Sequence, residues 1–431
     1  MTRARRWLLG AGIFAGLLVL LAVVVVRLIP SSEELARRLS GELEAALGVP
    51  VSIGALHWRL LPSPSVVIEN AATGQPQPIE VKRLSVWLDT SALWQRRLKV
   101  ERALVAGAVL PQLSLRGLGR PPAASAPLEA KTFTLDGLPP ARIEFRDVTW
   151  VSRRGIRLVY DGEADFDAGW RPRTAALRRP GTSPPAEMAL ARQGQDDRWE
   201  VKNTVGGGTA HGDMQLQTGA DGGLRLAGKL QPRHIDIVST LQAFGRRSVV
   251  AGKLSGDTTL SARGSNLVDI AWSLHTTTRF SVGPATLLRF DVGKAIRSLG
   301  REHDGSTPLD AISGQIDTQN TPQGMVVTFT GLKMRSGALS ATGKARVANR
   351  QIDAELAVDL VDGVVGVPLT LSGPVDKVRV AVPPSALAGA AVGTAVLPGV
   401  GIAIGARIGS AIGKLLGSEP EDKRRLAPVE K

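Results

Sequence analysis

The segment Met325–Leu360 reads MVVTFTGLKMRSGALSATGKARVANRQIDAELAVDL and contains the pattern that decides the fold. In its first part, Met325–Met334, and in its last part, Ile352–Leu360, apolar residues alternate with polar ones. A period of two places the apolar side chains on one face of a strand and the polar ones on the other. The segment therefore predicts antiparallel strands with one buried and one solvated face.

The same alternation extends from Val51 to about Val382, in short segments separated by Gly, Pro, Asn or Asp. Two interior stretches look helical instead, Ile235–Phe244 and Ala285–Leu299, and two are predicted as loops, Arg120–Pro127 and Arg171–Pro185. The other predicted strands include Val66–Asn70, Leu84–Asp89, Gln112–Gly117, Arg142–Val151, Gly223–Leu230, Val367–Pro374 and Lys377–Val382. The fold class that follows is mainly β, an elongated and curved antiparallel sheet with few short helices.

Composition agrees with this fold class and excludes several functions. The 431 residues include 48 Gly and 27 Pro but only 4% aromatic residues, and Gly and Pro together exceed the roughly 12% of an average protein. The absence of cysteine excludes disulfides, a thiol nucleophile and Cys-ligated metals. The net charge of +14 suits a polyanion or an anionic membrane surface.

The N-terminal residues predict a membrane anchor. The 20 residues of Trp7–Val26 carry no charge, and at about 1.5 Å per residue a helix of this length spans a bilayer core of about 30 Å. Arg3, Arg5 and Arg6 precede the run and Arg27 follows it, so we expect a cytoplasmic N-terminus and a single pass. The alternative is a cleaved signal peptide, but the run is long for one and no A-x-A-like site follows.

A capped amphipathic helix is predicted next. Ser31 and Glu34 form an S-x-x-E capping box, and Gly48 marks the end of the helix. Its apolar stripe consists of Leu35, Leu39, Leu43 and Leu47. The stripe suits either the membrane interface or packing against the mouth of a β domain, and the mixed charges of the polar face favour packing.

The C-terminal stretch Ala386–Gly417 has only two charged residues, and glycine recurs there with a period of four. The repeat consists of Gly401, Gly405, Gly409, Gly413 and Gly417. Glycine costs about 1 kcal/mol in a solvated helix, so the register indicates close packing against the bare backbone. We favour a helical hairpin that packs in a membrane; the alternative is a helical pair that covers the open end of the β structure.

The sequence contains no recognisable catalytic, metal or cofactor motif. The five histidines do not form an H-x-x-x-H arrangement, GKLSG at Gly252–Gly256 is a predicted turn, and the acidic pairs Asp165/Asp167 and Asp196/Asp197 are expected to be solvated. We therefore expect no catalytic residue, no cofactor and no metal, and a hydrolase is disfavoured.

The densest basic region lies between residues 153 and 179. It consists of Arg153, Arg154, Arg157, Arg171, Arg173, Arg178 and Arg179. These arginines suit attraction to lipid phosphates or a solvated loop, and the loop is favoured. No aromatic-interleaved basic motif accompanies them, so nucleic-acid binding is disfavoured.

Several of these segments resemble the AsmA family, envelope proteins related in architecture to the chorein-type bridge lipid-transfer proteins. The N-terminal resemblance is carried by ELEAALG, by VPVSIGALHWRLLPSPSVVIEN (Val49–Asn70) and by LSVWLDTSALWQRRLKVERALVAGAVL (Leu84–Leu110). The C-terminal resemblance is carried by GGGTAHGDMQLQ (Gly206–Gln217), GKLSGDTTLSARGS (Gly252–Ser265), the run Gly314–Leu360 and VPLTLSGPVDKVRV (Val367–Val380).

The resemblance implies a non-enzymatic lipid conduit. The apolar face of the sheet would hold phospholipid acyl chains, or those of lipopolysaccharide, in a groove, while the headgroups stay in water. The candidate lining residues are Val86, Leu226, Val327, Phe329, Leu356, Val358, Leu369 and Leu371. The expected location is the bacterial inner membrane with the bulk in the periplasm, serving lipid transport and outer-membrane biogenesis. The alternative is a non-transporting scaffold that binds envelope protein partners.

We expect five segments. They are a cytoplasmic stub and anchor (1–29), an AsmA-like helix with strands (30–120), a periplasmic β-groove (121–385), the glycine-rich hairpin (386–417) and a charged tail (418–431).

Overall fold

The computed structural model describes residues 32–59, 63–94, 97–117, 134–135, 140–167, 171–220, 222–265, 267–321, 324–337, 339–360, 367–375 and 377–382. The predicted anchor, Ser31 of the capping box, the Arg120–Pro127 loop, the glycine-rich hairpin with its five repeated glycines, and the charged tail lie outside these residues. Of the described residues 64% are in strands, which confirms a mainly β protein with few helices. Two compact units divide between Leu177 and Arg178.

The N-terminal unit begins with the helix α2 (Ser32–Leu47), which ends at the predicted glycine. Gly48 has a φ of 72°, and its N–H donates to the carbonyl of Glu44 over 2.8 Å, a geometry that glycine adopts without steric cost. The helix contacts the first strand, β1. This contact agrees with the expectation that α2 packs against the β structure.

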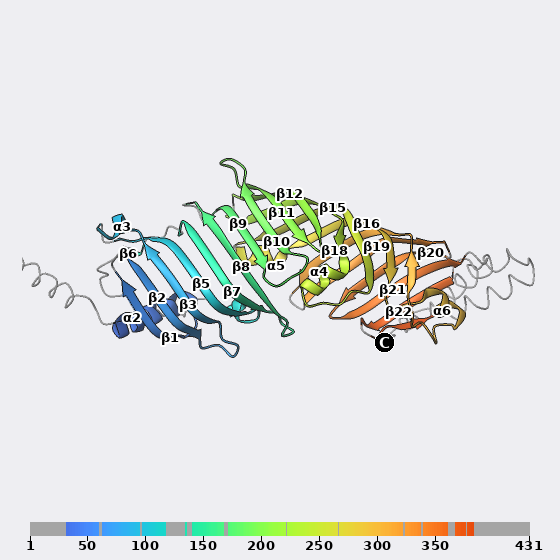
Figure 1. Cartoon of the computed structure of the whole chain (residues 1–431), viewed down its shortest axis with the longest axis horizontal. Helices are drawn as coiled ribbons and strands as arrows, with labels where there is room; N and C mark the ends of the chain where they lie inside the picture. Colours follow the sequence, from blue (N-terminus) through green and yellow to red (C-terminus); the bar gives the residue numbers. More distant parts are fainter. Residues whose placement is uncertain are drawn as a thin grey trace, which may run out of the picture. The chain divides into compact units, whose positions relative to one another are not determined.

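The sheet of the N-terminal unit has the strand order β1-β2-β3-β5-β7-β8 (Figure 1). Its strands are β1 (Val51–Arg59), β2 (Ser65–Thr73), β3 (Glu80–Leu88), β5 (Val100–Pro111), β7 (Arg142–Val151) and β8 (Arg157–Phe166). The pairs are antiparallel except for β5 and β7, which run parallel. The expectation of a purely antiparallel sheet is wrong there, because the long connection from Pro111 to Arg142 permits the crossover that parallel strands need.

Three short elements complete the description of this unit. They are α3 (Thr90–Trp94), the small parallel pair of β4 (Arg97–Leu98) with β6 (Thr134–Leu135), and the 3-10 turn η1 (Ser114–Gly117). The prediction of a strand over Gln112–Gly117 is wrong. Ser114 instead hydrogen-bonds the carbonyl of Gln77 and accepts at its own carbonyl from Gln75 Nε2 over 3.0 Å, so side-chain bonds hold the segment in a turn.

The sheet of the C-terminal unit is antiparallel, in the order β10-β11-β12-β13-β15-β16-β18-β19-β20-β21-β22-β23. Its strands are β10 (Ala186–Arg192), β11 (Arg198–Val205), β12 (Gly208–Thr218), β13 (Leu224–Arg233), β15 (Val250–Gly264), β16 (His275–Leu287), β18 (Ala311–Thr321), β19 (Gly324–Ser336), β20 (Leu339–Ala348), β21 (Gln351–Leu360), β22 (Val367–Pro374) and β23 (Arg379–Ala381). Two short strands, β14 (Ile235–Asp236) and β17 (Thr307–Leu309), pair at the ends of longer ones.

Three short helices belong to this unit: α4 (Ile237–Ala243), α5 (Leu267–Ser273) and α6 (Val292–Arg297). The carboxylate of Asp236 caps α4, and that of Asp291 caps α6 by accepting from the N–H of Lys294 over 2.8 Å. The helix predicted over Ile235–Phe244 is confirmed in α4.

Three predictions about this part of the chain are wrong. The helix predicted from Ala285 begins only at Val292, because Ala285–Leu287 pair with β15 and β17 in β16. The loop predicted over Arg171–Pro185 contains the strand β9 (Pro172–Arg179), in which exposed and half-buried side chains alternate from Thr174 onward. The turn predicted over Gly252–Gly256 is instead part of the strand β15. In addition, the short helix α5 was not predicted.

The curvature of the C-terminal sheet depends on glycines on its apolar face. A Cβ atom at Gly343 would meet the carbonyl oxygen of Glu355 and the side chain of Leu356, both on the neighbouring β21. A Cβ atom at Gly212 would likewise meet the carbonyl oxygen of Lys229 on β13. The neighbouring backbone occupies the space that a Cβ atom would take, so glycine permits the close approach of the strands in this curved sheet.

We predict that Gly343→Ala destabilises the C-terminal unit by about 1–3 kcal/mol, the usual cost of forcing extra atoms into packed structure. The matched control is Gly337→Ala, because nothing lies within 4 Å of the Cβ position there. Thermal unfolding followed by circular dichroism checks the pair. Equal midpoints for the two variants would contradict this explanation of the curvature.

Candidate functional site

Strand register separates apolar from polar side chains in the C-terminal unit. On β21, Leu356 pairs with Gly343 on one side and with Leu369 on the other, and Val358 pairs with Ala341 and Val367. The intervening residue Glu355 points to the opposite face, where its carboxylate lies 3.2 Å from Lys344 Nζ. The sheet therefore has one apolar face and one charged face.

The register continues this apolar face across the remaining strands. Phe329 pairs with Ile316, Phe280 with Gly314, and Leu226 with both Leu216 and Ala262. Seven of the eight candidate lining residues lie on this face: Leu226 on β13, Val327 and Phe329 on β19, Leu356 and Val358 on β21, and Leu369 and Leu371 on β22.

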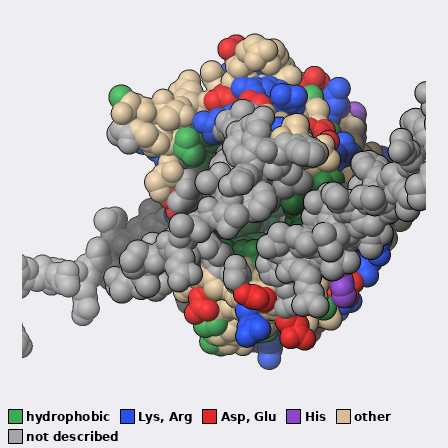
Figure 2. Space-filling view, turned by 90° about the vertical axis from the view of Figure 1, so that its left-hand side faces the viewer, with side chains coloured by type: hydrophobic (Ala, Val, Ile, Leu, Met, Phe, Trp, Pro, Cys, Tyr) green, Lys and Arg blue, Asp and Glu red, His purple; other side chains and the backbone are tan. Residues whose placement is uncertain are grey.

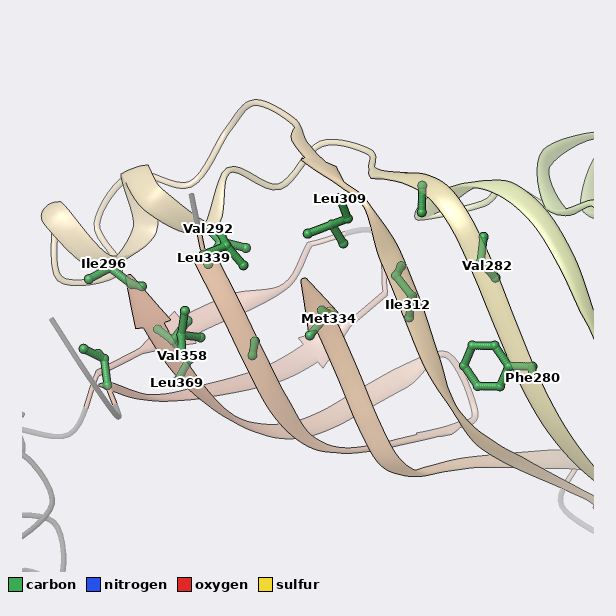
Figure 3. Close-up of a cluster of buried hydrophobic side chains, with 13 residues drawn as sticks. Phe280, Val282, Val292, Ile296, Leu309, Ile312, Met334, Leu339, Val358 and Leu369 are labelled. Atoms are coloured by element: carbon green, nitrogen blue, oxygen red, sulfur yellow. The ribbon is translucent and has the colours of Figure 1, made fainter. Parts of the chain in front are cut away.

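One part of the apolar face is a closed core. Val358 is 0% exposed and Leu369 is 1% exposed. The side chains of Val292 and Ile296, from α6, and of Leu309, from β17, pack against this part of the sheet (Figure 3). Because other protein side chains already cover Val358 and Leu369, these two candidates belong to the closed core and offer no accessible surface.

A polar bridge fixes the segment that closes this core. The Thr307 hydroxyl donates to the carbonyl of Phe290 and accepts from the N–H of Val292, both over 2.9 Å. The bridge ties β17 to the start of α6, which gives the short helix a fixed position over the strands. A helix was predicted in this region, but its packing over the strands could not be, because that contact joins segments far apart in the chain.

The remaining candidates lie outside the closed core. Leu226, Val327, Phe329, Leu356 and Leu371 are half-buried. Phe329 and Leu356 pack at the margin of the core cluster without being enclosed by it. Beyond the part that α6 covers, the apolar face therefore keeps accessible apolar surface.

The sheet of the N-terminal unit is built in the same way. Val86, the eighth candidate, is half-buried and pairs with Val66 and Ala103. On its neighbours, Ile68 pairs with both Leu56 and Leu84. This apolar row is again half-buried over most of its length, with Leu56 and Ile68 buried.

Charged pairs cover the opposite face of the N-terminal sheet. The guanidinium of Arg142 contacts the carboxylates of Glu144, Glu163 and Asp165. The hydrogen bond to Glu144, followed by the negative charge of Glu163 and Asp165, raises the pKa of Arg142. Next to this network, the guanidinium of Arg102 lies 4.3 Å from the centroid of the Trp87 ring.

The acidic pairs lie in polar surroundings, as expected, and three of their four carboxylates also have partners in the protein. Asp165 also accepts from Thr174 Oγ1 over 2.7 Å, and Asp197 pairs with Arg192 over 3.0 Å. Asp167 accepts from the backbone N–H of Arg171 over 3.0 Å. These carboxylates belong to the polar face and its turns.

The charged face of the C-terminal unit holds a further bonded carboxylate. Asp317 accepts from Gln315 Nε2 over 2.9 Å and from Thr277 Oγ1 over 2.7 Å. These hydrogen bonds, with a smaller contribution from His275, lower the pKa of Asp317. Asp317 is therefore held by polar side chains of its own face.

Figure 2 shows how the two kinds of side chain are distributed on one end of the molecule. Lys, Arg, Asp and Glu lie around the periphery of that end, and hydrophobic side chains gather towards its middle. This distribution is what the register predicts for sheets that curve with the apolar face inward.

The described residues contain no group of three or more His, Asp or Glu side chains that could hold a metal ion. Among the helices of the same residues, none is both long enough and apolar enough to cross a bilayer. No known protein family model, no curated protein and no solved structure matches the chain.

We predict different costs for truncating two leucines on the same face of β22. Leu369→Ala should destabilise the protein by about 2–5 kcal/mol, the cost of opening a cavity in a packed core. Leu371→Ala should cost clearly less, because its side chain is only half-buried. Denaturant midpoints measure the pair, and equal costs would show that the closed core extends further than the structure indicates.

Proposed function

We propose that this protein is an AsmA-like envelope protein that binds phospholipid acyl chains on the apolar face of its curved sheet. In this proposal the apolar segment Trp7–Val26 anchors it in the inner membrane, and the β units act in the periplasm. The observation that carries the proposal is the half-buried apolar surface left beside the closed core, on sheets whose other face is charged. The resemblance of Val49–Asn70 and Gly314–Leu360 to the AsmA family supports it.

The energetics suit an acyl chain as the occupant. Each methylene removed from water contributes about 0.8 kcal/mol, so a chain laid over several half-buried side chains gains several kcal/mol without a directional contact. The residues named above, such as Leu226, Phe329 and Leu356, supply such contacts and no hydrogen-bonding group. The free energy of binding therefore depends little on where the acyl chain lies along the face, and this allows the acyl chain to slide.

The position of the lipid headgroup follows from the cost of removing charge from water. A phosphate buried without partners is strongly disfavoured, so it remains at the margin of the sheet while the tails lie on the apolar face. No covalent step is required. Movement would need only a gradient of lipid along the face and the exchange of one set of apolar contacts for another.

The closed core sets a limit on the path. Where α6 covers Val358 and Leu369, side chains of the protein take the place that acyl chains would occupy. In the proposed function, lipid therefore occupies the half-buried region and leaves the face before it reaches α6, or passes only when α6 moves away.

Photo-crosslinking of adjacent residues tests the proposal. A benzophenone amino acid replaces Phe329 or Leu356, which lie on the apolar face, and in matched controls it replaces Thr330 or Ala357, which are exposed on the other face. After irradiation of cells that make the full chain, mass spectrometry of the purified protein should find phospholipid adducts at Phe329 and Leu356 only.

Two results would contradict the proposal. Equal lipid adducts at Thr330 and Ala357 would show contact without a preferred face. Adducts at Phe329 and Leu356 that contain only protein would favour the alternative, in which the apolar face holds protein partners and the chain acts as an envelope scaffold.

A further inference from the structure

The turn between α4 and β15 combines unpaired positive charge with an exposed apolar side chain. Arg246 and Arg247 are exposed at the turn, and Val249 is 49% exposed, the highest value among the large hydrophobic residues that the structure describes. Gly245, with a φ of 64°, ends the helix and donates its N–H to the carbonyl of Gln242 over 2.9 Å.

Backbone pairing brings a third arginine to the same place. Val250 pairs with Leu287, and the N–H of Leu288 donates to the carbonyl of Val249 over 2.8 Å. Because this bond joins Leu288 to Val249, the next residue, Arg289, lies at the same corner of the sheet as Val249. Arg289 is exposed. We call Arg246, Arg247, Val249 and Arg289 the basic corner.

A fourth arginine stands beside the basic corner. The guanidinium of Arg179, on β9, lies 5.8 Å from the centroid of the Phe244 ring, immediately before the turn. The sequence had pointed to Arg179 as part of a basic region, but Arg246, Arg247 and Arg289 are too far apart in the chain to be recognised as one group.

The acidic residues nearest to these arginines in sequence form no ion pair with them. Asp236 and Asp291 cap α4 and α6, and Asp257 lies 3.9 Å from Arg233. None of Arg246, Arg247 and Arg289 forms an ion pair with any residue that the structure describes. Three guanidinium groups thus remain available to an external anion.

We propose that the basic corner docks on the surface of an anionic lipid bilayer. Guanidinium groups bind phosphate in a bidentate manner, and an exposed valine among them can enter the boundary between headgroups and acyl chains. Just inside the corner, Val250 and Leu287 pack against the closed core, so the docking site lies where the apolar face meets the charged exterior. The inference does not depend on acyl chains being bound to that face.

The test uses a fluorescent probe at the tip of the corner. The chain contains no cysteine, so Val249→Cys can be labelled alone with an environment-sensitive dye, in the full chain held in neutral phosphatidylcholine nanodiscs. Added phosphatidylglycerol vesicles should shift the emission to shorter wavelength, and phosphatidylcholine vesicles should not. Met188→Cys serves as the control probe, since Met188 is an exposed apolar side chain on β10 and is not part of the basic corner.

Charge substitutions identify the residues responsible. A basic residue near an anionic surface is worth about fivefold in affinity, so Arg246→Gln, Arg247→Gln and Arg289→Gln together should raise the half-saturating lipid concentration roughly a hundredfold. Lysine at the three positions should restore most of the binding. A matched triple variant on the outer face of the sheet, Arg225→Gln, Lys229→Gln and Arg263→Gln, should leave it unchanged.

Four results would overturn the inference: an equal shift with neutral vesicles, an equal response at Met188, an unchanged affinity in the corner variant, or the same shift with inorganic phosphate alone. Circular dichroism confirms that the variants are folded. Lipid adducts at Phe329 are measured separately in the corner variant, so loss of docking is distinguished from failure of the proposed acyl-chain site.

Discussion

The structure depends on one constraint, the two-residue period of β-strands. Every second side chain of a strand points to the same face, and so do the side chains directly opposite on the paired strands. The pairing of Leu356 with Gly343 and Leu369 fixes the register of the whole of β21. A shift of one residue would bring Glu355 and the other polar residues of the strand to the apolar face. The same constraint acts in both units, and it gives each sheet one mainly apolar face and one mainly polar face.

A sheet with one apolar face must bury that face, and this protein does so only in part. The helix α6 and the short strand β17 complete a core around Val358. Elsewhere the apolar side chains stay half-buried, supported by the curvature that the glycines allow. The same architecture thus provides a stable core and, beside it, a surface suited to apolar ligands, and the two roles are divided along the strands.

Much of the fold could be predicted from the sequence, because alternation is a local signal. The predicted strands Arg142–Val151 and Val367–Pro374 coincide with β7 and β22. The parallel pairing of β5 with β7 could not be predicted, since the partner of a strand across a long connection is not a local property. The strand β9 was hidden by its Pro and Arg residues, which are typical of loops but are tolerated where side chains face solvent.

The candidate site shows the same limit. Alternation placed the lining residues on the correct face, but it could not separate Leu369, which is enclosed, from Leu371, which is half-buried, because burial depends on α6, an element distant in sequence. The basic corner was missed for the same reason. Its arginines come together only through the pairing of β15 with β16.

The central claim is that the apolar face carries acyl chains, and the phospholipid that co-purifies with the full chain tests it most directly. Leu356→Asp places a carboxylate on the apolar face, whereas Ala357→Asp places the same group one residue away on the exposed face. Quantitative lipid mass spectrometry should find that Ala357→Asp retains the phospholipid of the wild-type protein and that Leu356→Asp, while still folded, loses most of it. Equal phospholipid in the two variants would contradict the account.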